Sequence, residues 1–234
     1  MRHRLFLMLL SMAILLGLSV TASAGEYTLK ITALPTTKAG NDYTGIFKGV
    51  LKYGSITENV SLICDDHGGD VYLYEPAWQV KENSINNLSG VEYGPGNHFY
   101  KGDSQLQAYA EMLWIADSML THPKMPGSQV SIDQFAIWDL FIPTLAPPKG
   151  VNDSAELALA QSWWTNTCMP NEASCLAGLS DLIIYTPVTP AGGWPPPYGR
   201  PQELVGTPEP ASMLLLGSFL SLAGGLLSKK TRRA

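Results

Sequence analysis

Apolar and polar residues alternate along the chain between Glu26 and Val80. The alternation covers four short segments, 27–34, 43–54, 58–66 and 70–80, which are separated by glycine and other turn residues. A period of two with many aromatic residues is typical of strands that bury one face. We therefore predict antiparallel strands here, followed by a long loop or lid from Lys81 to Gly102.

Apolar residues recur at helical spacing from Ser104 onward, and either Asp103 or Ser104 is the predicted cap of this first helix. This helix continues to Leu120. A second is predicted from Ser131 to Ile142, because Pro143 lacks an amide hydrogen and disfavours helix in the residue before it. A third begins at Asp153 or Ser154. The apolar segment 179–188 is then predicted to be a strand that returns to the sheet.

The order of these elements, strands, then helices, then a strand, favours an α+β domain over alternating βαβ units. We predict an antiparallel β-sheet or sandwich with a helical insertion over residues 25–190. Residues 191–207 are rich in proline and glycine and are predicted to be an extended linker.

Residues 1–24 have the pattern of an export signal. Arg2 and Arg4 precede an apolar run, and the run ends in the small residues Ala22, Ser23 and Ala24. This order is typical of a signal helix that is removed after Ala24. The alternative is a membrane helix that the protein keeps.

A second apolar run, 211–228, is long enough to span a bilayer as a transmembrane helix, and the basic tail after it predicts a cytoplasmic end. With Pro208, Glu209 and Pro210 before it, the segment 208–234 resembles the sorting signal of PEP-CTERM proteins. That resemblance implies export in a Gram-negative bacterium, processing by an exosortase-type enzyme, and a place in the cell envelope, the extracellular matrix or a biofilm. The alternative is an ordinary C-terminal anchor.

Charge restricts the partners of the exported region. Residues 25–228 contain 20 acidic and 9 basic residues. An acidic surface repels phosphate backbones, so no nucleic acid is expected to bind. No phosphate-binding glycine loop and no G-x-S-x-G elbow occurs in the sequence, and no cofactor is expected.

The chain has three cysteines. Cys168 and Cys175 flank a short loop with a proline, and in an exported protein this favours a disulfide. Cys64 is then without a cysteine partner, at the end of an apolar strand.

Gln134 has two interpretations. If the second helix begins at Ser131, Ser-x-x-Gln forms a capping box in which the two side chains satisfy backbone amides. Alternatively, Gln134 is the chemical partner of Cys64.

The second interpretation comes from a resemblance. Ile63-Cys64, followed by Asp133-Gln134-Phe135-Ala136-Ile137-Trp138, resembles the paired motifs of the thioester domain of Gram-positive surface adhesins. In that family a cysteine forms an internal thioester with a glutamine in the pattern Thr-Gln-x-Ala-aliphatic-Trp. The chain departs from it at Asp133, where the family favours threonine, and at Ile63, where it favours Tyr, Phe or Leu.

The resemblance implies a covalent adhesin and not a turnover enzyme. A thioester of Cys64 and Gln134, shielded by Trp114 and Trp138, would react with an amine-bearing surface partner. Helix amides near Gln134 are expected to stabilise the oxyanion. The alternative is a noncovalent structural or carbohydrate-binding protein with the same fold, associated with exopolysaccharide.

Asp65, Asp66 and Asp70 follow Cys64 in a glycine-containing turn. Clustered carboxylates suit a hard cation such as calcium, but a solvated turn needs the same residue types. A zinc hydrolase would need ligands from a second segment, and the histidines do not supply an i, i+4 pair. We therefore assign no metal, and cation binding stays open.

Overall fold

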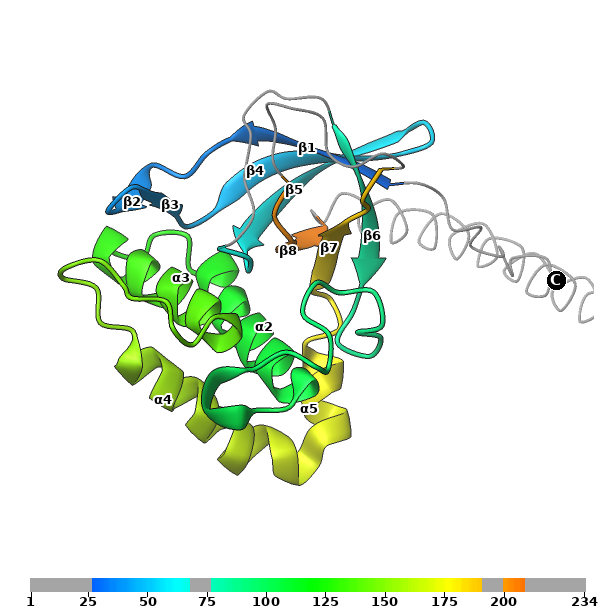
Figure 1. Cartoon of the computed structure of the whole chain (residues 1–234). Coiled ribbons are helices and arrows are strands. Elements are labelled where there is room, and N and C mark those ends of the chain that lie inside the picture. The colour runs from blue at the N-terminus through cyan, green and yellow to red at the C-terminus, as the bar shows by residue number, and fades with distance from the viewer. Residues whose placement is uncertain (1–26, 68–76, 191–199, 209–234) are drawn as a thin grey trace, which may run out of the picture.

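The computed structural model describes residues 27–67, 77–190 and 200–208. These residues form a β-barrel with a layer of helices across one end (Figure 1). The predicted signal, residues 1–24, and the predicted membrane segment, 211–228, lie outside this described part. Within it, no helix combines the length and apolar character that crossing a membrane requires.

Antiparallel strands close the barrel in the order β1-β4-β5-β8-β7-β6, since β6 also pairs with β1. The six strands are β1 (Tyr27–Ala33), β4 (Phe47–Tyr53), β5 (Ile56–Cys64), β6 (Trp78–Asn83), β7 (Ile183–Pro187) and β8 (Leu204–Pro208). A separate hairpin consists of β2 (Thr37–Ala39) and β3 (Asp42–Thr44). The prediction of mixed α and β structure with antiparallel strands is confirmed, but the sheet is a closed barrel and not a sandwich.

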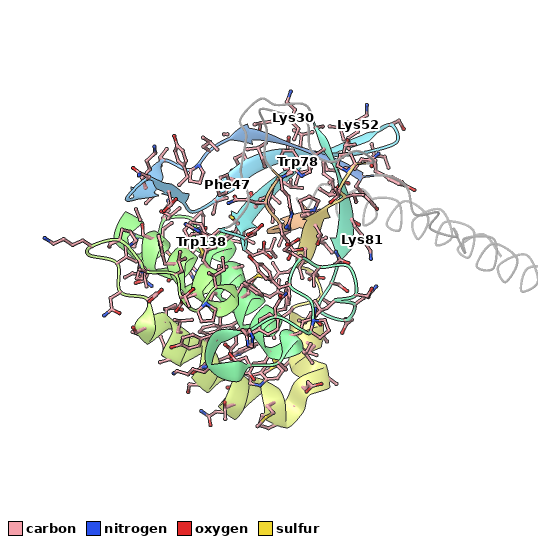
Figure 2. The ribbon with its side chains drawn as sticks, viewed as in Figure 1. Lys30, Phe47, Lys52, Trp78, Lys81 and Trp138 are labelled. Carbon is pink, nitrogen blue, oxygen red and sulfur yellow. A yellow bond between two sulfur atoms is a disulfide. The ribbon has the colours of Figure 1, made fainter. Side chains whose placement is uncertain are left out.

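Alternating residues of each strand fill the barrel. Phe47 and Leu51 on β4 are buried, whereas Lys52 projects from the outside, as does Lys30 on β1 (Figure 2). Gly49 lies between the two buried residues because a Cβ there would come within 2.9 Å of the Leu62 side chain. The barrel interior is therefore close-packed, and its size is set by small residues where two strands approach each other.

The helical insertion lies between β6 and β7. It contains α2 (Gln105–Thr121), α3 (Gly127–Phe141), α4 (Ser154–Trp163) and α5 (Glu172–Gly178), with short helical turns at η1 (Tyr100–Gly102), η2 (Trp164–Cys168) and η3 (Met169–Asn171). Ser104 caps α2 as predicted, because its side chain accepts a hydrogen bond from the Gln107 amide. The buried faces of α2 and α3 join the barrel interior in one continuous core.

The prediction that residues 191–207 form a linker is wrong at its C-terminal end. β8 inserts between β5 and β7, where Val205 pairs with Ile63 on one side and with Ile184 on the other. Gly206 permits this pairing, because a Cβ at that position would overlap the Ser61 carbonyl. The domain therefore extends beyond residue 190 to include β8, and the barrel needs β8 to close.

Candidate functional site

Cys64 and Gln134 meet where the barrel joins the helices. Cys64 is the last residue of β5, and Gln134 lies in the middle of α3. The Gln134 side-chain amide donates a hydrogen bond of 2.5 Å to the Cys64 carbonyl oxygen, although the two residues are 70 positions apart. Both are completely buried. The fold thus brings together the two residues that the sequence pairs.

Gln134 is not a helix cap. α3 begins at Gly127, one turn before the predicted start, so Ser131 is an interior residue of the helix. Its hydroxyl bonds the Gly127 carbonyl and lies 3.0 Å from the Thr44 hydroxyl. The capping-box interpretation is therefore wrong. The Gln134 side chain points out of the helix toward β5, where its contacts are made by residues far away in sequence.

A backbone amide holds the other end of the Gln134 amide group. Gly45 N–H donates to Gln134 Oε1 at 3.4 Å. Gly45 has φ +111, and an added Cβ would come within 2.9 Å of Val130, so both the backbone conformation and the space require glycine. A donor aimed at a carbonyl oxygen is what stabilises an oxyanion during acyl transfer. This donor comes from the segment after β3, and not from the start of α3 as the sequence suggested.

The Cys64 thiol has two acceptors. It lies 3.0 Å from the Asp66 carbonyl oxygen and 3.0 Å from Gln202 Oε1. Burial, with the negative charges of Asp65 and Asp66, raises the pKa of this thiol well above its ordinary value, while Trp138 acts in the opposite direction. The thiol is therefore protonated at neutral pH. It must lose its proton at the moment of reaction, because it is not a free thiolate beforehand.

Gln202 was missed because it falls in the proline-rich segment. It precedes β8 and is buried against the end of β5. The pair Leu204-Val205 is the one apolar step in 202–207, and it is too short a signal to identify β8 or, through it, Gln202.

Behind Cys64 lies a pair of buried carboxyl groups, Asp65 and Glu203. Burial raises the pKa of each, and the charge of Glu203 raises the pKa of Asp65 further. Neither side-chain oxygen of Asp65 has a hydrogen-bond partner among the described residues. Glu203 accepts from Tyr109, whose hydroxyl lies 2.8 Å away, and from the Thr186 hydroxyl. Burial therefore favours the neutral form of both carboxyl groups, of which Asp65 directly follows Cys64 in the chain.

The Asp66 carboxylate makes a hydrogen bond and an ion pair on the other side of the turn. Tyr93 donates to it at 2.9 Å, and Arg200 lies 3.8 Å from its second oxygen while also pairing with Glu92. Asp70 lies outside the described residues. Over 27–67, 77–190 and 200–208, no group of three His, Cys, Asp or Glu side chains has the arrangement of a metal site.

The two tryptophans predicted to shield the site differ in position. Trp138 is buried one helical turn after Gln134, between Phe135 at 4.9 Å and His67 at 4.8 Å, at the junction of barrel and helices (Figure 2). Trp114 instead stacks on Trp163 at 5.5 Å and packs α2 against α4. Its shielding role stays a prediction, whereas Trp138 lies next to Gln134 on α3 and is placed for that role.

Asp133 does not disturb the site. Although it is the neighbour of Gln134 in sequence, it lies on a different side of α3, where its carboxylate accepts a hydrogen bond of 2.6 Å from Gln129. Burial raises its pKa. The Asp133 side chain is thus bound within its own helix and not to Gln134.

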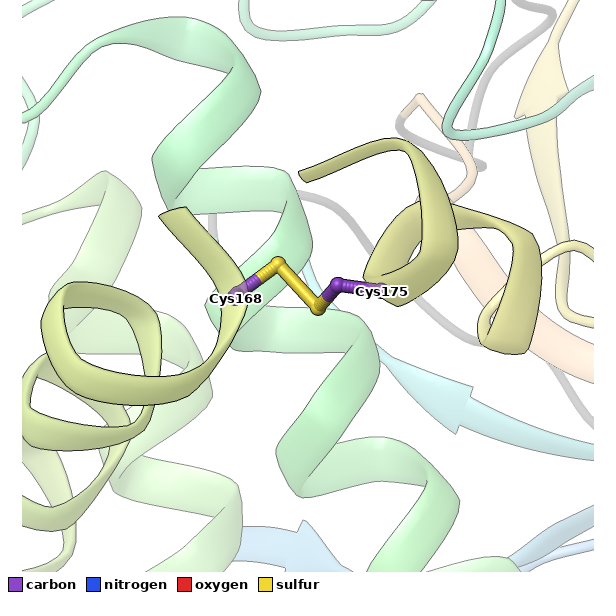
Figure 3. Close-up of a disulfide and its surroundings, with 2 residues drawn as sticks. All are labelled: Cys168 and Cys175. Atoms are coloured by element: carbon purple, nitrogen blue, oxygen red, sulfur yellow. A yellow bond between two sulfur atoms is a disulfide. The ribbon is translucent and has the colours of Figure 1, made fainter. Parts of the chain in front are cut away.

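Cys168 and Cys175 form the predicted disulfide. The bond joins η2 to α5, with Cα atoms 5.1 Å apart (Figure 3). Among the described cysteines, Cys64 is the free one, and it is buried.

The first residue of the predicted sorting motif belongs to a strand of the barrel. Pro208 is the last residue of β8 and pairs with Val60, while Glu209 and Pro210 lie outside the described residues. Comparison of this chain with models of known protein families, with curated proteins and with solved structures finds no match.

Proposed function

We propose that the protein is an exported surface or matrix protein that captures a partner covalently through a thioester between Cys64 and Gln134. One observation carries the proposal. The Gln134 amide is held between the Cys64 carbonyl and the Gly45 N–H in a site that excludes water. A buried Gln and Cys in contact, with a donor on the amide oxygen, are the components that acyl transfer needs.

The reaction begins when Cys64 Sγ attacks the side-chain carbonyl carbon of Gln134. The sulfur gives up its hydrogen bonds to Asp66 and Gln202, and the Gly45 N–H stabilises the negative oxygen that forms. The C–N bond then breaks and ammonia leaves with the thiol proton. The product is a thioester, which stores an activated acyl group on α3.

A primary amine on a partner then attacks the same carbon. The C–S bond breaks, an amide bond to the partner forms, and the Cys64 thiol is regenerated. Each molecule reacts once, so the protein is an adhesin and not a turnover enzyme. An acidic exported region attracts partners that carry lysine.

Export and sorting complete the proposal. The signal-like residues 1–24 and the Pro-Glu-Pro tail support delivery to the envelope or matrix of a Gram-negative bacterium by an exosortase-type enzyme, with a transient membrane stage through 211–228.

The test is capture of a labelled amine. The full chain, recovered after export, is incubated with a biotin-tagged primary amine, and its peptides are mapped by mass spectrometry. We expect the amine on residue 134 only. Gln134→Glu, which keeps the shape but has no amide to displace, and Cys64→Ser are the matched controls and should take up none. Unlabelled wild-type protein, or label elsewhere, would contradict the proposal and favour a noncovalent role in exopolysaccharide binding.

A further inference from the structure

We infer that His67 is the general base for attack by the partner amine, with Asp42 placed to stabilise the charged imidazole. This inference rests on the proposed thioester and adds the group that moves the proton. It is carried by the partial exposure of His67 and by its packing on Phe135 and Trp138, which follow Gln134 on α3.

His67 lies three residues after Cys64, in the turn that follows β5. Its ring meets Trp138 edge-on at 4.8 Å and Phe135 at 6.5 Å. These two residues lie one and four positions after Gln134, on the side of α3 that faces the turn. The imidazole is therefore packed over the helix segment that carries the acyl group.

The exposure of His67 differs from that of the reacting residues. Its side chain is 30% exposed, whereas Cys64 and Gln134 have no exposed surface. An incoming amine must come from solvent, where part of the His67 side chain is exposed, while its ring packs on the α3 residues that follow Gln134. A base in this position meets the amine before it reaches the acyl carbon.

Asp42 gives the imidazole a charged neighbour. Its Oδ2 lies 3.6 Å from His67 Nε2, which is longer than a hydrogen bond but close enough for a charge pair once the ring is protonated. Asp42 begins β3, the strand that leads directly to Gly45. One strand thus places both the carboxylate beside the base and, just beyond its end, the amide that holds the acyl oxygen.

The proton balance of the step closes without another reactant. As the amine nitrogen bonds to the acyl carbon, the imidazole takes a proton from that nitrogen. The C–S bond breaks and its electron pair stays on Cys64 Sγ. The imidazolium then returns the proton to sulfur, and His67 is neutral again. Burial raises the pKa of the Cys64 thiol, so the departing thiolate accepts this proton readily.

The test separates formation of the thioester from its use. The variants are His67→Gln, Asp42→Asn and a control, His98→Gln, in which an exposed loop histidine is replaced. Mass spectrometry first shows that each variant has the mass deficit of one ammonia. The second-order rate with methylamine is then measured. We expect His67→Gln to react about 100-fold more slowly, the low end of the range for general-base catalysis, and Asp42→Asn several-fold more slowly. The control should match wild type.

Two further readouts complete the test. Free imidazole should restore part of the rate of a His67→Gly variant, which a merely structural role would not allow. An unchanged rate in His67→Gln with its thioester intact would overturn the role of His67 alone. A missing deficit in His67→Gln but not in wild type would also overturn it, because His67 would then act in forming the bond. A wild-type protein with no deficit would overturn the thioester itself.

Discussion

The chain uses its cysteines in two different places and in two different ways. Cys64 lies at the junction of barrel and helices, where β5, α3 and the residues before β8 meet, and its contacts come from residues up to 138 positions away. Cys168 and Cys175 lie at the end of the helical layer and are separated by 7 positions. The disulfide fixes a local turn, whereas the environment of Cys64 exists only when the whole domain is folded. Tertiary structure thus sets the surroundings of the cysteine in one region, while a local crosslink joins two neighbouring segments in the other.

A substitution that disrupts β8 should have the largest effect, because it should affect the Cys64 site and leave the disulfide intact. In Gly206→Ala the new methyl group would overlap the Ser61 carbonyl, and overpacking against backbone destabilises by about 3 kcal/mol. Gln202 would lose its position beside Cys64, so the thioester should be lost as well, while the disulfide still forms. Urea unfolding and a free-thiol assay measure both effects. Gly178→Ala is the control, because nothing lies near its added methyl group. Unchanged stability in Gly206→Ala would contradict the place of β8 in the barrel.

Removing the disulfide should lower the stability of the protein and leave the Cys64 site unchanged. The Cys168→Ser, Cys175→Ser double variant should lose about 2 kcal/mol of unfolding free energy, as expected for a short closed loop. The Cys64–Gln134 contact involves neither η2 nor α5, so the thioester should form to the same extent. Chemical denaturation and reaction with a labelled amine check the two parts. Loss of amine capture in a folded double variant would show that the regions are coupled.

A change of pH should act on buried carboxyl groups both beside Cys64 and on α2. Burial raises the pKa of Asp65 and Glu203, and that of Glu111 on α2 to about 7. A carboxyl whose pKa is higher in the folded state binds more protons when folded, so stability is greatest at low pH and falls as pH rises. For Glu111 the window runs from about 4.3, its unfolded value, to about 7.

We therefore expect the free energy of unfolding to fall by about 1 kcal/mol between pH 5 and pH 8. Glu111→Gln and Asp65→Asn should each flatten the slope, because neither amide titrates. Removing the disulfide should leave the slope unchanged. Stability that increases over this range would contradict the buried, protonated state of these groups.

The smallest effect should distinguish the two tryptophans. Trp138→Phe leaves a smaller ring beside Cys64, so water reaches the thioester more easily and its hydrolysis should become a few times faster. Trp114→Phe changes the contact between α2 and α4 and should leave that rate unchanged. The thioester lifetime, followed by mass spectrometry in buffer, compares the two. Equal lifetimes would mean that Trp138 does not shield the bond.

The sequence predicted the local features of this fold well. The cap at Ser104, the helix face of α2, the strand β7 and the disulfide each depend on residues close together in sequence. The barrel was not predicted, because its closure depends on the register between β1 and β6, which no local pattern contains.

Two predictions were wrong for the same reason: the contacts that fix these elements come from segments far away in the sequence. The start of α3 was placed at Ser131 because Gly127 and the polar residues after it give a weak helical signal, whereas the Ser131–Thr44 contact holds the helix in place from another segment. β8 was placed in a linker because its surroundings are rich in proline and glycine. Gly206 is there for a close approach to β5 that only the folded barrel makes visible.

The most direct test of the account is the intact mass of the exported chain beside that of a Cys64→Ala variant, each compared with the mass calculated from its own sequence and termini. If a shortened chain is used for this measurement, it must include all of β8, because a chain that ends before residue 208 would lack part of this strand. We predict that wild type is lighter by one ammonia, that methylamine adds to it in proportion, and that the variant shows neither change. A wild-type mass reduced only by the two hydrogens of the disulfide would contradict the thioester.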